Sequence, residues 1–327
     1  MNRLERSWYQ PVGLLNILLL PLSGVFWLLS SLRRALFKLG LKRVYKAPVP
    51  VIIVGNIGIG GNGKTPFVLW LVPYLEALGL KVAVISRGYG AHPPSLPYRV
   101  TDSSSATEAG DEPLLIYKRL GCPVMIGGDR QASIELLMRE DKPDIIVSDD
   151  GLQHYQLARD IEICIVDAQR RFGNTLLLPA GPLRETPSRL KHTDLVVYNG
   201  KSDGVGYELV RSGYFSVRDN QTIEKIAEQG IAVSAIGNPQ RFEQSLRSDG
   251  VELLDTLHFA DHHAYSEPDF ATCEDQAVFM TEKDAVKCQS FGKENWYYLK
   301  VDAQPSAELI QQLNSLLKQK GIVNHGL

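Results

Sequence analysis

The sequence of 327 residues is poor in cysteine and has no excess of charge of either sign. Its four cysteines lie far apart and form no C-x-x-C pair, which argues against a zinc site and against a disulfide framework. They are Cys122, Cys164, Cys273 and Cys288. Lys and Arg number 35 against 37 Asp and Glu. Because a nucleic-acid surface needs a basic excess, we expect no nucleic-acid partner.

Charge is also absent from the stretch between Arg6 and Arg33, where residues 12–32 are dominated by Leu, Ile, Val, Phe and Trp. About 20 apolar residues are enough for a helix to cross a membrane, and no cleavage site of signal-peptide type is evident. The basic cluster that follows favours the anionic cytoplasmic face of a membrane. It consists of Arg33, Arg34, Lys38, Lys42, Arg43 and Lys46. We predict that residues 1–47 form a membrane-associated helix with a basic flank, and that the catalytic body is cytoplasmic.

Four residues interrupt the apolar stretch and count against a spanning helix, namely Asn16, Pro21, Ser23 and Gly24. The sequence leaves open whether the helix spans the bilayer or lies in its interface. A further alternative is a core helix packed on the protein. That alternative is disfavoured because an all-round apolar helix needs burial on every side, and because the basic cluster would have no role in it.

Glycine is concentrated in the run Gly58-Ile59-Gly60-Gly61-Asn62-Gly63-Lys64-Thr65, which fits the phosphate-binding loop pattern G-x-x-x-x-G-K-[ST]. Residues 49–54 are typical of a buried strand, and residues 66–78 have apolar positions at helical spacing, so the loop has the required context. Glycine lets successive backbone N–H groups turn toward one anion at the positive end of the helix. We predict that this run binds the phosphates of a nucleotide, that Lys64 contacts its β- and γ-phosphates, and that the Thr65 hydroxyl binds Mg²⁺.

Acidic and basic residues follow other predicted strands at the same edge of the sheet. The strand at 144–150 ends in Asp149 and Asp150, the Walker B arrangement that holds or orients a metal ion. Arg130 follows the strand at 122–126. For His154, just past the acidic pair, a structural role and a functional one are equally expected.

Two further residues have open assignments. Asp111 opens a predicted helix, where an acidic residue is more often a capping group than a catalytic one. Arg184 stands in a loop rich in glycine and proline, placed as a phosphate-contacting arginine would be, although it could instead pair with a surface acid.

The predicted elements divide the chain into four parts. Residues 1–47 are the N-terminal helix and its flank, and residues 48–204 are a P-loop NTPase-like, mostly parallel α/β domain. Residues 205–230 contain a two-stranded hairpin around Gly213, and residues 231–327 form a smaller α/β domain without a second phosphate loop. The fold class is therefore α/β, with a cleft expected between two domains that a β-hairpin joins.

The ordered motifs of the chain resemble those of the tetraacyldisaccharide 4′-kinase family, the lipid A kinases of Gram-negative bacteria. They are G-x-G-G-x-G-K-T-P, S-R-G-Y-G, G-D-E-P, G-G-D-R, S-D-D-G-L-Q-H, L-P-A-G-P-L-R-E, D-H-H-x-Y and T-E-K-D-A-V-K. The resemblance covers nearly the whole chain. It implies transfer of the γ-phosphate of ATP to the 4′-hydroxyl of an acylated glucosamine disaccharide 1-phosphate, a lipid A precursor, at the cytoplasmic face of the inner membrane.

The resemblance also implies roles for single residues. Lys64 and Thr65 match the phosphate and Mg²⁺ residues, and Asp149 and Asp150 match the metal-site acids. Asp111 matches the base for the sugar hydroxyl, oriented or tuned by a histidine of the D-H-H stretch. We expect His262 in this role, with His263 left open as the alternative. The positions that line the cleft are Arg130, Gln153, His154 and Arg184.

Other functions remain as alternatives. A membrane-associated regulatory P-loop ATPase would carry an additional lysine early in the loop, where this chain has Ile59. A GTP-binding switch would need [NT]-K-x-D, whereas Lys283 stands one place too late after Thr281. A non-enzymatic membrane scaffold is disfavoured by the intact Lys64, Thr65 and Asp149.

Overall fold

The structure is a computed structural model that describes residues 3–200, 204–273 and 275–323. Within these ranges one continuous sheet has the order β11-β10-β12-β13-β8-β7-β6-β1-β5-β2-β4-β3, with β9 paired to β8. Its neighbours are parallel, except that β3 is antiparallel to β4, and β13 and β9 are antiparallel to β8. The predicted mostly parallel α/β architecture is confirmed.

The larger half of the sheet has β1 at its centre, between β5 and β6. Alternate residues of β1 face two cores, Ile52 and Val54 on the side of α3, and Val51 and Ile53 on the other. Because both faces are covered, the strand is apolar throughout instead of alternating. The strands are β1 (Val51–Gly55), β2 (Val82–Ser86), β3 (Tyr98–Arg99), β4 (Val124–Ile126), β5 (Ile145–Asp149), β6 (Ile161–Asp167) and β7 (Leu195–Asn199).

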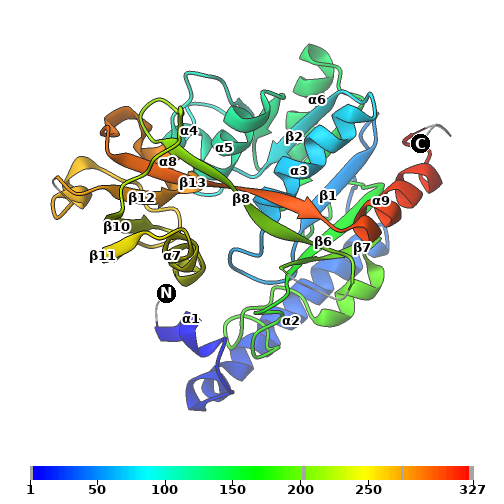
Figure 1. The fold of residues 1–327 in the computed structure, drawn as a ribbon. Helices are drawn as coiled ribbons and strands as arrows, with labels where there is room; N and C mark the ends of the chain where they lie inside the picture. The colour runs from blue at the N-terminus through cyan, green and yellow to red at the C-terminus, as the bar shows by residue number, and fades with distance from the viewer. Residues whose placement is uncertain (1–2, 201–203, 274, 324–327) are drawn as a thin grey trace.

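Helices cover this half and begin near the carboxyl ends of its strands (Figure 1). The α-helices are α3 (Lys64–Ala77), α4 (Ala106–Ala109), α5 (Asp111–Leu120) and α6 (Arg130–Glu140), and η1 (Pro187–His192) is a 3₁₀ helix. Since ligands of open α/β sheets gather at the carboxyl ends of the strands, the phosphate loop, Arg130 and the Asp149–Asp150 pair share the edge where a ligand is expected.

The connection between the two halves of the sheet differs in detail from the prediction. Gly213 is not a turn, because β8 (Gly206–Ser216) continues through it, with a shift in the pairing register at Gly213. The hairpin in this region turns later, between β8 and β9 (Thr222–Ile223). The main partner of β8 is β13 (Trp296–Pro305), from near the end of the chain, and these two long strands join the halves (Figure 1). A strand that finds its partner about 90 residues away leaves no local sequence signal.

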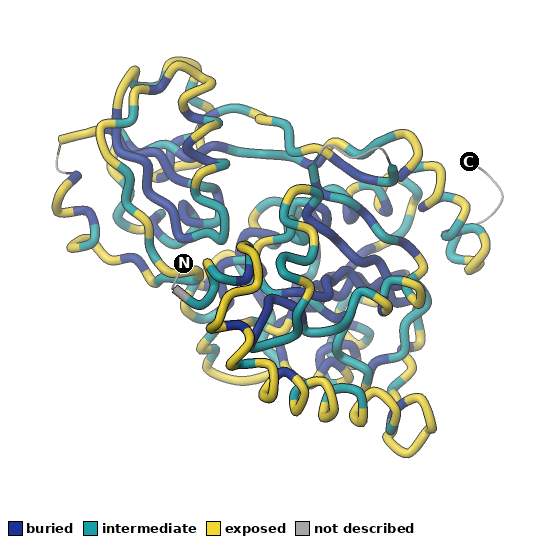
Figure 2. Tube along the Cα trace, turned by 90° about the horizontal axis from the view of Figure 1, so that it is seen from below, coloured by how far each residue is buried: buried dark blue, intermediate teal, exposed yellow. Residues whose placement is uncertain are grey.

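The smaller half of the sheet has its own buried clusters, so buried segments gather in two regions of the molecule (Figure 2). Its elements are β10 (Gln229–Ser234), α7 (Pro239–Ser248), β11 (Glu252–His258), η2 (Glu267–Phe270), β12 (Val278–Thr281), α8 (Glu282–Cys288) and η3 (Gln289–Phe291). The sequence did not predict β11, which is the outermost strand of the sheet and has no buried residue.

The last helix, α9 (Ala307–Gln319), packs differently from the prediction, which assigned it to the smaller domain. Its buried residues Leu309, Leu313 and Leu317 belong to the core on the α3 side of β1. The hydroxyl of Tyr74 on α3 donates a hydrogen bond to Oδ1 of Asn314 at 2.6 Å. The chain therefore returns to the larger half after β13. The predicted boundaries at residues 47, 204 and 230 stay predictions.

Near the N-terminus, α1 (Arg3–Ser7) and α2 (Leu14–Lys38) lie along one side of the larger half (Figure 1). Among the described helices, α2 is long and apolar enough to cross a membrane. Its side chains are mostly exposed, and only Asn16, Ser23 and Phe37 are buried. The core-helix alternative is therefore wrong, because a core helix would bury its apolar residues.

Candidate active site

Two side chains hold the end of the phosphate loop, between β1 and α3. The Tyr207 hydroxyl donates a hydrogen bond to the carbonyl oxygen of Gly63 at 2.5 Å, and Asn199 Nδ2 donates one to that of Asn62 at 3.2 Å. Gly63 has a φ of +91°, and a Cβ there would lie 2.3 Å from both Asn199 Nδ2 and the Tyr207 hydroxyl. Both the backbone and the available space thus require glycine. Lys64 follows as the first residue of α3.

Lys64 is joined to the acidic end of β5. Its Nζ lies 3.5 Å from Oδ1 of Asp150, and the Arg184 guanidinium lies 3.1 Å from Oδ2 of the same carboxylate. Burial alone would raise the pKa of Asp150, but the charges of Lys64 and Arg184 outweigh it and lower this pKa to about 2. Asp150 is therefore ionised at neutral pH, and three residues predicted from separate segments meet at one place.

Asp149 has the opposite environment. Its side chain is buried, and Oδ1 has no hydrogen-bond partner within the described ranges. Burial, helped by the negative charge of Glu112, raises the pKa of Asp149 to about 7. An unpartnered buried carboxylate oxygen fits a hard cation such as Mg²⁺. No group of three or more His, Cys, Asp or Glu that could hold a metal ion occurs among the residues described.

A second buried carboxylate, Asp111, begins α5. Its oxygens lie 2.9 and 3.0 Å from Nδ1 of His262, and its Oδ2 lies 3.7 Å from Nζ of Lys283 and 3.9 Å from Nζ of Lys287. Burial would raise the pKa of Asp111, but the hydrogen bond with His262 and the two ammonium groups outweigh it and lower this pKa to about 2. The same hydrogen bond raises the pKa of His262.

The two adjacent histidines have different partners. His262 contacts Asp111, and its backbone has a φ of +62°, which non-glycine residues seldom adopt. His263 instead pairs with Asp269, with 3.2 Å between Nε2 and Oδ2. The predicted contact of Asp111 with His262 is therefore present. An uncommon backbone conformation is maintained at the histidine that touches the carboxylate, as is frequent at functional sites.

Glu112 connects Asp111 with the edge that carries the phosphate loop. Its charge contributes to the raised pKa of Asp149, and its Oε1 accepts a hydrogen bond from Lys283 Nζ at 3.0 Å. The sequence analysis gave no role in the site to Glu112, Lys283 or Lys287, although the motifs G-D-E-P and T-E-K-D-A-V-K contain them. The available signal was the spacing of the two lysines, which puts both ammonium groups on one face of a helix.

Of two residues predicted to line the cleft, Arg130 is engaged with the protein itself, and His154 is uncharged. The Arg130 side chain is buried, and it donates hydrogen bonds to the carbonyl oxygens of Gly127 and Asp149, each at 3.3 Å. The prediction was a contact with substrate. The guanidinium instead binds backbone carbonyl oxygens next to the ends of two strands. Burial and the nearby positive charge of Arg130 lower the pKa of His154 to about 4, so this ring is neutral at pH 7.

Gln153 and Arg184 join a network around Glu185, which the sequence analysis did not select. Gln153 Nε2 donates hydrogen bonds to the carbonyl oxygen of Asn56 at 2.9 Å and to Oε2 of Glu185 at 3.0 Å. Its Oε1 accepts one from Arg184 at 3.3 Å. Arg34 of α2 lies 4.0 Å from Glu185. The network thus extends from the phosphate-loop strand to the N-terminal helix.

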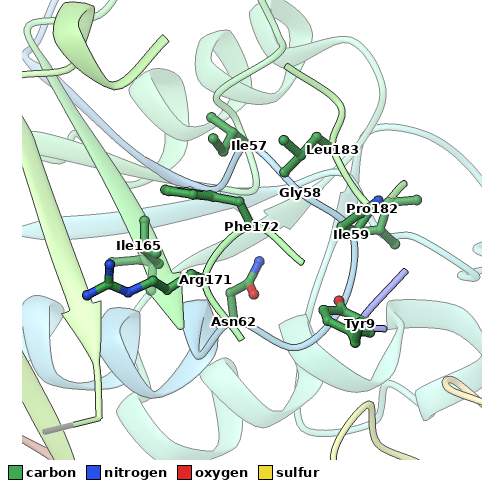
Figure 3. Close-up of a pocket in the computed structure, with 11 residues that line it drawn as sticks. Tyr9, Ile57, Gly58, Ile59, Asn62, Ile165, Arg171, Phe172, Pro182 and Leu183 are labelled. Atoms are coloured by element: carbon green, nitrogen blue, oxygen red, sulfur yellow. The ribbon is translucent and has the colours of Figure 1, made fainter. Parts of the chain in front are cut away.

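A small pocket lies beside the start of the phosphate loop (Figure 3). Its lining includes Gly58 of the phosphate loop, Phe172 of the segment after β6, Pro182 of the segment 177–184, and Tyr9 of the N-terminal segment. The guanidinium of Arg170 lies over the Tyr9 ring, 5.1 Å from its centroid. The N-terminal segment therefore reaches the nucleotide edge of the sheet.

A phosphate loop is common to many nucleotide hydrolases and switches, whereas a separate buried carboxylate–histidine pair at the same edge suits an acceptor that must lose a proton. The fold and the site together define a phosphate-loop kinase. Comparison with known proteins narrows this class. The family model described as LpxK, tetraacyldisaccharide-1-P 4′-kinase, matches residues 15–318. The chain belongs to this family.

Individual relatives agree. The chain is 55% identical to the tetraacyldisaccharide 4′-kinase of Pseudoalteromonas translucida, over 99% of both chains. It is 52% identical to that of Haemophilus influenzae, over 91% of both chains. A crystal structure of the apo form of LpxK from Aquifex aeolicus in complex with ATP superimposes with a TM-score of 0.76 at 28% identity, covering 94% of this chain and 99% of that one. The predicted family and the predicted activity, an ATP-using kinase of lipid A biosynthesis, are confirmed, and the regulatory-ATPase alternative is set aside.

Proposed function

We propose that this chain transfers the γ-phosphate of ATP to the 4′-hydroxyl of tetraacyldisaccharide 1-phosphate, forming lipid IVA at the cytoplasmic surface of the inner membrane. Family membership supports the reaction. The observation that carries the residue assignment is the Asp111–His262 pair, which adjoins Glu112 at the edge where Asp149 and Lys64 lie. The acceptor hydroxyl would meet the γ-phosphate between these groups.

Charge neutralisation is the main task at the phosphate side, since phosphoryl transfer passes through a loose transition state. We assign this task to the amides of residues 58–65, to Lys64 and to Arg184. Asp150 holds both cations in place until ATP arrives. Thr65, Asp149 and Asp150 would hold Mg²⁺, which when bound neutralises phosphate charge.

Asp111 and His262 act on the acceptor. The Asp111 carboxylate would accept a hydrogen bond from the 4′-hydroxyl and orient its oxygen toward phosphorus. The proton leaves late, and neutral His262 can take it up because its reference pKa of about 6.5 lies close to the operating pH. We further assign Arg130 and Gln153 to bracing the backbone around the acceptor, and His154 to a neutral contact in the cleft.

The N-terminal helix would lie in the membrane interface and not across the bilayer. It touches the body near its start, where Asn16 Nδ2 donates to the Ala180 carbonyl oxygen at 2.9 Å, and near its end, where the rings of Phe37 and Tyr155 lie 6.1 Å apart. A spanning helix could not keep both contacts, because the polar body stays outside the hydrocarbon. Apolar residues on the outer side are more than half exposed, among them Leu14, Leu18, Val25, Leu29 and Leu32.

The basic cluster at 33–46 fits the same orientation. Each Lys or Arg near an anionic membrane surface contributes about 1 kcal/mol to binding, and the contribution falls with salt. A lipid acceptor in the same membrane surface would then reach the active site with its acyl chains still close to the bilayer.

The test is phosphate transfer from γ-labelled ATP, with Mg²⁺, to tetraacylated glucosamine disaccharide 1-phosphate in mixed micelles. We expect a labelled bisphosphorylated lipid, and no label with Lys64→Ala. Hydrolysis of ATP without labelled lipid, in an otherwise active preparation, would contradict the proposal and favour a regulatory ATPase.

A further inference from the structure

Three polar or amphipathic residues of the N-terminal segment are directed at a single loop of the body. Ser23 Oγ donates a hydrogen bond to the Leu177 carbonyl oxygen at 2.8 Å and accepts one from the Ala180 backbone N–H at 3.1 Å. Asn16 Nδ2 donates to the carbonyl oxygen of Ala180, and Trp8 Nε1 donates to that of Pro179 at 3.0 Å. All three side chains are buried.

These contacts explain why the apolar stretch contains Asn16 and Ser23. The two residues are seven positions apart, which places them on the same face of a helix. That face meets the loop, so their polar groups are hydrogen-bonded and not exposed to lipid. The remaining faces keep the apolar residues outward.

The other side of the same loop holds the phosphate loop and a catalytic arginine. The backbone N–H of Ile59 donates to the Pro182 carbonyl oxygen at 2.8 Å, and that of Arg184 donates to the Ile57 carbonyl oxygen at 2.7 Å. Gly58 and Leu183 form a β-bridge. The Arg184 side chain then reaches Asp150. The segment 177–184 is therefore bound by the N-terminal helix on one side and by the start of the phosphate loop on the other.

The loop between these two attachments is short and internally braced. The backbone N–H of Leu178 donates to the Leu183 carbonyl oxygen at 2.9 Å, and that of Leu183 donates to the Leu176 carbonyl oxygen at 3.1 Å. Asn174 Nδ2 donates to the Ala180 carbonyl oxygen at 2.9 Å. A displacement at Ser23 is thus transmitted over a few residues to Ile59 and Arg184, because the loop has little freedom to absorb it.

We propose that Ser23 and Asn16 are positioning residues of the nucleotide site: the helix that binds the membrane also holds loop 177–184, and through it the phosphate loop and Arg184, in the geometry that binds ATP. The inference rests on the proposed function for the membrane role of α2, but it makes a separate claim. The helix is a structural part of the ATP site whether or not a membrane is present.

The test compares Ser23→Val with Ser23→Thr. The two replacements have nearly the same shape, and only threonine keeps the hydroxyl. We expect Ser23→Val to raise the KM for ATP and to lower kcat. Together these changes should lower kcat/KM about tenfold, as expected for the loss of a buried hydrogen-bonding group. Ser23→Thr should keep most of the wild-type kcat/KM. Asn16→Leu should act in the same direction, and it carries the test if Ser23→Val does not fold.

Ser30→Val is the matched control. Ser30 lies seven positions after Ser23 on the same helix, and within the described part of the chain its hydroxyl donates a hydrogen bond to the Trp27 carbonyl oxygen of the same helix at 3.1 Å. Ser30→Val adds the same apolar side chain to the helix as Ser23→Val, and we expect it to leave the KM for ATP unchanged.

Two readouts separate this proposal from simple anchoring. ATP affinity is measured by calorimetry in detergent without lipid acceptor, and membrane binding is measured by co-sedimentation with vesicles of phosphatidylethanolamine and phosphatidylglycerol. We expect Ser23→Val to lose ATP affinity and keep vesicle binding. Wild-type ATP affinity in folded Ser23→Val overturns the inference. Failure of the wild-type chain to bind vesicles would instead contradict the membrane part of the proposed function, and the ATP comparison would still stand.

Discussion

Nδ1 of His262 lies 2.9 Å from Oδ1 of Asp111, although 151 positions separate the two residues in the chain. Asp111 begins a helix of the larger half, whereas His262 belongs to the part of the chain that builds the smaller half. The pair therefore exists only while the two halves are in contact. Under the proposed function, contact between the halves would complete the acceptor side of the site.

The first prediction concerns the pH dependence of turnover. Because the hydrogen bond with Asp111 raises the pKa of His262, the ring stays protonated to higher pH than an ordinary histidine. Only the neutral ring can take up a proton, so kcat should rise with pH and reach half its maximum above about pH 6.5, the reference value. His262→Gln should remove this limb from the kcat profile, and His263→Gln should retain it. An identical limb in His262→Gln would contradict the assigned role.

The second prediction separates chemistry from nucleotide binding. Asp111→Asn keeps the size of the side chain and removes the negative charge that orients the 4′-hydroxyl and His262. We expect kcat to fall by about 10²- to 10⁴-fold, the usual contribution of general acid–base catalysis, because His262 is then no longer held to take up the proton, while the dissociation constant for ATP changes little. Single-turnover kinetics and calorimetry measure the two quantities. An equal loss of both would point to a capping role at the start of α5.

The third prediction compares two glycines of the phosphate loop. A methyl group at Gly63 would clash with Asn199 and Tyr207, and its φ of +91° disfavours alanine. A methyl group at Gly61 would have no atom within 4 Å. We expect Gly63→Ala to lower the free energy of unfolding by about 1–3 kcal/mol and to weaken ATP binding strongly. Gly61→Ala should unfold like the wild type in denaturant titrations, and equal destabilisation by both would contradict the steric constraint at residue 63.

The fourth prediction concerns the ion pairs that join α5 to the smaller half. Arg119 on α5 donates hydrogen bonds to both carboxylate oxygens of Glu282 on α8, at 3.0 and 2.8 Å, and also pairs with Asp302 on β13. Arg119 keeps 16% of its side chain exposed, so solvent weakens these pairs.

Arg119→Met should lower the free energy of unfolding by about 2 kcal/mol, because it leaves Glu282 without its cation. This loss is smaller than for a fully buried pair, since solvent reaches Arg119. It should also lower kcat, since α5 carries Asp111. Arg139→Met is the control, because Arg139 keeps 73% of its side chain exposed. Denaturant unfolding measures the difference, and equal stability of the two variants would mean that the Arg119 pairs are replaceable by water.

The sequence was sufficient for features that depend on local order. The phosphate loop was predictable because strand, glycine run and helix follow one another within about 30 residues, as this loop requires. The meeting of Lys64 with Asp150 followed from the rule that parallel strands end at one edge. The contact of Asp111 with His262 came from the family resemblance, since no spacing rule joins residues so far apart.

Features that depend on distant partners were not predictable. Gly213 suggested a turn, but β8 stays paired with β13 on both sides of it, with a register shift at the glycine. β11 was missed because an exposed edge strand lacks the apolar pattern that indicates strands. Asn16 and Ser23 looked like interruptions of an apolar helix, and the position of residues 177–180 gives them hydrogen-bond partners in the body of the protein. The burial of Arg130 likewise follows from the carbonyl oxygens around it.

The packing of α9 against the α3 side of β1 has a consequence for biosynthesis. A ribosome makes the phosphate-loop strands first and the helix with Leu309, Leu313 and Leu317 almost last, yet these leucines belong to the same core. Until they emerge, the nascent larger half exposes an apolar surface, which favours aggregation of partly synthesised chains. Messages truncated before codon 307 should accordingly yield a product that proteases remove, even though every residue of the nucleotide loop has been translated.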